Sequence, residues 1–170
     1  MTRAARGACK IDIVVKSGLW MEPGKVKTVL RRAVRAAADT SSTNGAELAI
    51  VLTDDSAIRL LNRDWRGIDA ATNVLSFPTE GAGGQPPIIG DIVLAYETVA
   101  REARAERKPF AHHLAHLAVH GFLHLVGYDH ERDQDAEAME QAERKILRTL
   151  AIPDPYRPRP KASKPAAKRR

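Results

Sequence analysis

All six histidines of this 170-residue chain fall between positions 112 and 130. Three of them form the pattern H-x-x-x-H-x-x-G-x-x-H, at His120, His124 and His130, with Gly127 between the last two. Residues four apart lie one turn apart on the same face of a helix. Gly127 can adopt the left-handed conformation that ends a helix, so the chain can turn back toward that face. The pattern therefore predicts a helix that ends near residue 127 and three imidazoles that meet beside it.

Three neutral imidazoles with a vacant fourth position are typical of a catalytic zinc site, whereas structural sites usually have four ligands and favour cysteine. The spacing equals that of the three-histidine site of metzincin proteases. His116, one turn earlier, is expected to hydrogen-bond behind the ligands, and His112 and His113 are expected at the surface. A row of histidines four apart could also be the polar edge of a packed helix. The sequence does not separate zinc from nickel or another imidazole-binding ion.

The residue after the first histidine of the pattern argues against a peptidase. Zincins carry the general-base glutamate there, and this chain has Gly121. Metal-activated water could still attack a substrate whose transition state needs charge neutralisation more than leaving-group protonation, and phosphodiesters are one such class. The sequence identifies neither a general base nor a general acid.

Hydrophobic periodicity predicts an α+β fold: a small mixed four-stranded sheet with about five helices, packed mainly on one side, and the His-rich helix at the centre. The first two strands should be parallel. Strands are expected over 9–16, 47–53, 72–77 and 88–95. Helices are expected over 23–39, 54–67, 97–107, 109–127 and 132–150. The core face of the His-rich helix should consist of Leu114, Leu117, Ala118, Gly121 and Leu125, and the second helix should pack through Ile58, Leu61 and Trp65.

The net charge of +6 is concentrated at the C-terminal end. Residues 153–170 contain seven of the 27 basic residues and one of the 21 acidic residues, so residues 1–152 are neutral overall. We predict one hydrolase domain over 1–152, and a Pro-rich, basic, disordered tail over 153–170. The tail could be a solvated segment or an arm that follows a polyanion such as RNA.

Cysteine usage and hydropathy indicate the compartment. Cys9 is the single cysteine, which excludes a disulfide-stapled class. The apolar run near the N-terminus is interrupted by Lys10, Asp12 and Lys16, so neither a signal peptide nor a membrane segment is expected. We expect a cytoplasmic protein with no membrane partner.

At the level of whole motifs the chain resembles a known family. H-G-F-L-H-L-V-G-Y-D-H at 120–130 is similar to the signature of the bacterial YbeY-type endoribonucleases, which are rRNA maturation factors. Further matches follow the same order as in that family: Leu61-Asn62 with Trp65-Arg66-Gly67, T-N-V-L-S-F-P at 72–78, and G-D-I-V at 90–93. The resemblance covers roughly residues 9–156.

The resemblance implies a single-strand-specific, metal-dependent endoribonuclease that acts in 16S rRNA 3′-end maturation and late-stage ribosome quality control. It implies one Zn²⁺ held by His120, His124 and His130, which would activate a water for attack on the phosphodiester. It also implies a catalytic role for Arg66, whose guanidinium can hold a phosphate through two parallel hydrogen bonds. The implied partners are single-stranded RNA, the 16S rRNA precursor and the small ribosomal subunit, with a ribosomal protein or an assembly GTPase as further candidates and no DNA.

Several alternatives stay open at this stage. The chain could be a non-catalytic ribosome-assembly factor whose zinc orders the fold, or a zinc hydrolase of another substrate. Asp91 and Asp129 could orient the imidazoles or transfer protons, and Asp129 could equally shape the turn after Gly127. Asn73 and Ser76 could serve only to satisfy backbone groups at a strand end.

Overall fold

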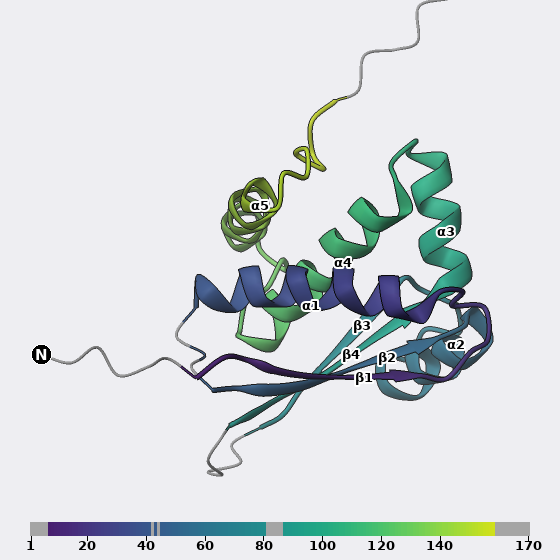
Figure 1. Cartoon of the computed structure of the whole chain (residues 1–170). Coiled ribbons are helices and arrows are strands. Elements are labelled where there is room, and N and C mark those ends of the chain that lie inside the picture. Colours follow the sequence, from purple (N-terminus) through teal and green to yellow (C-terminus); the bar gives the residue numbers. More distant parts are fainter. Residues whose placement is uncertain (1–6, 42, 44, 81–86, 159–170) are drawn as a thin grey trace, which may run out of the picture.

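The computed structural model describes residues 7–41, 43, 45–80 and 87–158, and a four-stranded sheet lies at its centre (Figure 1). The strands are β1 (Lys10–Val15), β2 (Glu47–Thr53), β3 (Val74–Pro78) and β4 (Ile88–Ala95). Their order in the sheet is β1-β2-β4-β3. β2 runs parallel to both β1 and β4, and β3 is an antiparallel edge strand beside β4. The predicted mixed sheet and the predicted parallel pairing of the first two strands are confirmed.

The described residues form five helices, as predicted: α1 (Pro23–Asp39), α2 (Asp55–Arg66), α3 (Tyr96–Ala105), α4 (Phe110–Leu125) and α5 (Asp133–Thr149). Successive side chains of a strand point to opposite faces of the sheet. Ile92 therefore joins the main core on the face covered by α1 and α4, whereas Val93 contributes to a small cluster around Ile58 of α2. Most helices thus gather on one face of the sheet, and α2 covers part of the other (Figure 1).

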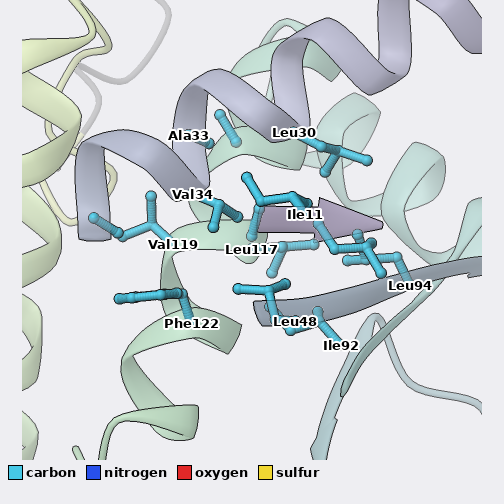
Figure 2. Close-up of a cluster of buried hydrophobic side chains, with 14 of the residues drawn as sticks. Ile11, Leu30, Ala33, Val34, Leu48, Ile92, Leu94, Leu117, Val119 and Phe122 are labelled. Atoms are coloured by element: carbon cyan, nitrogen blue, oxygen red, sulfur yellow. The ribbon is translucent and has the colours of Figure 1, made fainter. Parts of the chain in front are cut away.

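In the main core, α1 and α4 pack against each other and against the same face of the sheet. Figure 2 shows Leu30 and Val34 of α1 facing Ile11 and Leu48 of the strands, with Phe122 of α4 beside them. The predicted core face of α4 is buried along its whole length, at Leu114, Leu117, Ala118, Gly121 and Leu125. Because this apolar face is fixed against the sheet, the histidine-bearing face of α4 has a defined direction.

Helix α2 begins and ends where the sequence predicts, but the last apolar residue of the helix is exposed. The side chain of Asp54 accepts a hydrogen bond from the backbone N–H of Ala57 at 3.0 Å, and Gly67 (φ 71°) ends the helix. We predicted that Trp65 would pack with Ile58, yet Trp65 is 72% exposed. It lies in the last turn beside β3, and β3 is the edge of the sheet, so no further strand covers the indole.

The segment 153–158 makes specific contacts, although we assigned it to the disordered tail. The guanidinium of Arg144 lies 5.1 Å from the ring centre of Tyr156, and Nε of Arg144 is 3.3 Å from Oδ1 of Asp154. Lys108 donates to the carbonyl of Pro155 at 3.4 Å. The ring of Tyr156 gives this segment a means of packing that the basic residues after it lack. Residues 159–170 of the predicted tail lie outside the described residues.

In the described part of the chain, no helix has the length and apolar character needed to cross a membrane.

Gly90 provides a test of how tightly β3, β4 and α4 are packed. Its φ is +139°, and a Cβ added there would overlap the carbonyl oxygen of Phe77 and lie 2.8 Å from Cδ2 of Leu125. We expect Gly90→Ala to lower the free energy of unfolding by about 3 kcal/mol in thermal or urea unfolding. The control is Gly24→Ala in α1, where a Cβ meets nothing within 4 Å. It should be neutral or up to ~1 kcal/mol stabilising, and equal effects of the two changes would contradict the close packing.

Candidate metal centre

The structure brings the three histidines of the sequence pattern together. His120 and His124 lie one turn apart on α4, and their Nε2 atoms are 3.1 Å from each other. Gly127 has a φ of +99°, and the chain after it returns so that the ring of His130 is centred 4.9 Å from that of His124. One ring nitrogen from each of the three histidines lies within 4.8 Å of the others. Within the described part of the chain, these three side chains form a group that could hold a metal ion.

A buried carboxylate lies behind this group. Glu143 of α5 is 0% exposed. Its Oε1 is 2.6 Å from Nδ1 of His120, its Oε2 is 2.7 Å from Nε2 of His116, and the hydroxyl of Tyr156 donates to the same Oε2. Burial by itself raises the pKa of Glu143, but the hydrogen bonds from His116 and His120 outweigh it and lower the pKa to about 2. Glu143 is therefore ionised at neutral pH and can only accept hydrogen bonds.

The charge on Glu143 fixes the tautomer of His120. Because the carboxylate only accepts, Nδ1 of His120 must carry the proton, and Nε2 of the neutral ring keeps its lone pair for the cluster. Burial lowers the pKa of His124, and the neighbouring rings of His120 and His130 lower it further. Metal ligation requires neutral imidazoles, and a carboxylate behind a ligating histidine is a common arrangement. The donor set therefore fits a zinc-like ion.

Arg66 lies at the edge of this centre. Its Nη2 is 3.5 Å from the backbone oxygen of Ser76 on β3, and its positive charge contributes to the lowered pKa of His124, after burial and the two other histidines. Oγ of Ser76 donates to the carbonyl of Gly121 at 3.1 Å, which ties β3 to α4 one residue after His120. The end of α2 thus brings a guanidinium across the edge strand toward the histidine cluster.

Gly121 faces the sheet, which gives a physical reason for the missing glutamate. A Cβ at this position would lie 3.0 Å from Cγ2 of Ile92 and 3.2 Å from Oγ of Ser76. A glutamate side chain would have to enter the packed layer between α4 and the strands. The zincin arrangement of ligand and general base on adjacent residues is therefore incompatible with this fold.

The other histidines differ from our expectations in one case. His116 hydrogen-bonds to Glu143 behind the cluster, as predicted. His113 was expected at the surface, but it is 4% exposed, and its Nε2 is 2.7 Å from Oε2 of Glu102. The amide of Asn73 donates to the same carboxylate at 2.9 Å, so Glu102 links α3, α4 and the start of β3. The expectation failed because His113 faces α3, a contact between elements that local sequence does not reveal.

Asp129 accepts hydrogen bonds at the turn that carries His130, whereas Asp91 lies exposed on the sheet. Oδ1 of Asp129 accepts from the backbone N–H groups of His130 and Glu131, at 2.6 and 3.2 Å. This is the turn-shaping alternative, and it positions the loop that carries His130. Asp91 is an exposed residue of β4.

Glu143 and Tyr156 are the site residues that sequence reasoning missed. Glu143 had a detectable signal, because it shares the apolar face of α5 with Met139, Ile146 and Leu147, all at most 2% exposed. A charged residue on such a face indicates a buried partner. Tyr156 gave no comparable signal in a segment rich in proline and charge.

A cavity of about 400 Å³ opens beside the cluster. Its lining includes His120, His116, Tyr156, Asn73 and Glu102. A larger cavity of about 890 Å³ continues toward the first turn of α4, but none of the three clustered histidines lines it. Of the three clustered histidines, His120 is the one that lines the smaller cavity.

Comparisons with known proteins identify the family of this chain. Residues 16–151 match the family model described as Endoribonuclease YbeY. A protein named Endoribonuclease YbeY from Rhodopseudomonas palustris is 53% identical, over 85% of this chain and 80% of its own length. A second, from Bradyrhizobium diazoefficiens, is 54% identical over 88% and 86%. A solution structure from Thermotoga maritima, 24% identical, shares the fold with a TM-score of 0.54, over 87% of this chain and 99% of that one. The chain belongs to the YbeY family of endoribonucleases.

Proposed function

We propose that this protein is a zinc-dependent endoribonuclease that cleaves single-stranded RNA. Its proposed substrate is the 3′ end of the 16S rRNA precursor on the small ribosomal subunit, where cleavage would serve both maturation and late quality control. The observation that carries the proposal is the cluster of His120, His124 and His130 beside an open cavity, with a guanidinium at its edge. The relatives named as endoribonucleases support the choice of RNA.

His120, His124 and His130 would hold the ion through their ring nitrogens. When bound, zinc supplies a Lewis acid and lowers the pKa of a bound water to about 7. Glu143 keeps the lone pair of His120 directed at the cluster, and His116 and Tyr156 hold Glu143 in place. Arg66 would bind the phosphate oxygens and offset the charge that develops on them in the transition state.

The decisive test combines metal content with cleavage of a 16S rRNA precursor extended at its 3′ end. We expect His124→Ala to lose stoichiometric zinc and to reduce cleavage on the order of 1000-fold, because two ligands no longer define the site. Elemental analysis and a gel assay measure the two effects. His112→Ala, on the same helix but outside the cluster, is the matched control and should retain both. A zinc-free His124→Ala protein that still cuts the precursor normally would refute the proposed site.

Arg66 distinguishes an enzyme from an assembly factor. We expect Arg66→Ala to lower kcat/KM for RNA cleavage about 100-fold, since one charge-stabilising donor is lost. Zinc content and melting temperature should be unchanged, because Arg66 is exposed and its one hydrogen bond here, to Ser76, is 3.5 Å long. Arg63→Ala on the same helix should stay within about twofold of the parent, since Arg63 already pairs with Asp64 at 2.9 Å. Unimpaired cleavage by Arg66→Ala would favour a non-catalytic assembly role.

Glu143 should control metal affinity. We expect Glu143→Gln to weaken zinc binding about 10- to 100-fold in competition with a chromogenic chelator, because the amide replaces one acceptor oxygen with a donor. Tyr156→Phe should give a smaller loss in the same direction. Glu137→Gln is the control, as an exposed residue of the same helix. An unchanged zinc affinity in a folded Glu143→Gln protein would show that the carboxylate does not orient His120.

A further inference from the structure

Trp65 is the most exposed large aromatic residue in the described part of the chain. Its exposure is 72%, whereas the only other tryptophan, Trp20, is 2% exposed and donates its indole N–H to the carbonyl of Thr53. Exposing an indole to water forgoes a large amount of hydrophobic stabilisation. A single exposed aromatic residue is not by itself a site, so its surroundings decide what it could bind.

The indole of Trp65 packs on one side against an aromatic ring of the sheet. It meets the ring of Phe77 edge to face, with centroids 5.9 Å apart and an interplanar angle of 68°. Phe77 belongs to β3 and is packed against the small cluster around Ile58, so its position is fixed by the sheet. Trp65 is also in the last turn of α2, whose end is set by Gly67. The result is a flat apolar surface held in place before any ligand arrives, which lowers the entropy cost of binding.

Three arginines lie on the helix that carries Trp65, and they differ in whether a carboxylate pairs with them. Arg59 and Arg63 of α2 are paired with Asp69 and Asp64, at 2.8 and 2.9 Å. Arg66, the next residue after Trp65, forms no ion pair with a carboxylate within the described ranges, and its Nη2 approaches a backbone carbonyl of β3. The surface therefore combines an aromatic face with an uncompensated guanidinium at the edge of the histidine cluster. Single-stranded nucleic acids are bound by this combination, through stacked bases and neutralised phosphates.

We propose that Trp65 is a stacking site for one unpaired nucleobase of the RNA strand whose phosphate is held at Arg66 and the histidine cluster. This inference rests on the proposed endoribonuclease function and deepens it. It also gives a physical basis for single-strand specificity. A base within a duplex is already stacked and paired, so its face is not available to the indole unless the duplex opens.

The test measures binding and cleavage of short single-stranded oligoribonucleotides by the zinc-loaded protein. We expect Trp65→Ala to raise the Kd for a non-cleavable 2′-O-methyl oligonucleotide about tenfold, and Trp65→Phe to raise it less. For cleavable RNA, KM should rise while kcat changes little, and zinc content and melting temperature should stay at the parent values. Leu60→Ala is the matched control, as a 49% exposed apolar residue of the same helix, and should leave Kd unchanged.

Oligonucleotides with one abasic position identify the stacked base. At one position near the cleaved phosphate, removal of the base should raise the Kd of the parent protein by the same factor as the Trp65→Ala substitution does. The Trp65→Ala protein should bind this abasic oligonucleotide and the intact one with the same Kd. Tryptophan fluorescence gives an independent readout. RNA should quench the exposed Trp65 but not the buried Trp20, so the quenching should disappear in Trp65→Phe.

The outcomes separate this inference from the function on which it rests. If the parent protein cleaves RNA and Trp65→Ala does so with the same KM, the endoribonuclease stands and the stacking site is refuted. An equal loss of affinity at every abasic position would also refute it, as would a surface at Trp65 that binds protein and not RNA. If the parent protein neither binds nor cleaves RNA, the proposed function itself is refuted, and the stacking site with it.

Discussion

The burial of one carboxylate determines how the candidate metal centre is built. Removing Glu143 from water costs several kcal/mol unless its oxygens are hydrogen-bonded. Here α4 supplies two imidazoles and the segment after α5 supplies a phenol, so α4, α5 and the chain at Tyr156 are joined at one side chain. The direction of the first ligand is set by the same contacts. The same hydrogen bonds at Glu143 therefore serve both the packing of the helices and the orientation of His120.

The sheet provides the second fixed boundary of the site. A Cβ at Gly90 would overlap the backbone of β3, and a Cβ at Gly121 would lie only 3.0 Å from Ile92, so α4 lies directly against β3 and β4. That close approach has a functional consequence, because it turns the residue after His120 inward and leaves the outward face of α4 to histidines. The edge strand β3 then separates this face from the end of α2, and only a long side chain such as Arg66 can extend across it.

The parts of the site that follow from sequence are those set by local geometry. The offsets between His120, His124, Gly127 and His130 are determined by the helical repeat and one positive-φ turn, so the cluster could be predicted. The caps of α2 and the parallel pairing of β1 with β2 follow from equally local or general rules. Tertiary contacts could not be predicted in this way. His113 is buried because α3 lies against it, whereas Trp65 is exposed because β3 is the edge strand of the sheet. Both results depend on which helices and strands become neighbours in the fold.

The start of the C-terminal tail is also determined by tertiary contacts that the sequence does not reveal. Composition correctly describes residues 153–158 as rich in proline and charge, and such composition usually cannot offset the entropy lost on ordering. Tyr156 changes the balance because its ring packs under Arg144 and its hydroxyl reaches a buried carboxylate that needs a donor. The contact that orders this segment is made to Glu143, thirteen residues earlier in the chain. The sequence of the segment alone therefore does not predict that it is ordered. A short ordered segment beyond the last helix thus contacts the carboxylate behind the histidine cluster.

The histidine spacing alone does not determine the chemistry of the site. The metzincin proteases use the same ligand offsets with a glutamate beside the first ligand, whereas here that position is closed by the packing of Gly121 on Ile92. Arg66 brings a guanidinium toward the cluster, and the residue before it, Trp65, exposes its indole. A cation suits a phosphate rather than a peptide carbonyl, and an aromatic face suits a base. The surroundings of the histidines, which the fold sets, therefore favour the phosphodiester of RNA, the substrate class of the family, over a peptide bond.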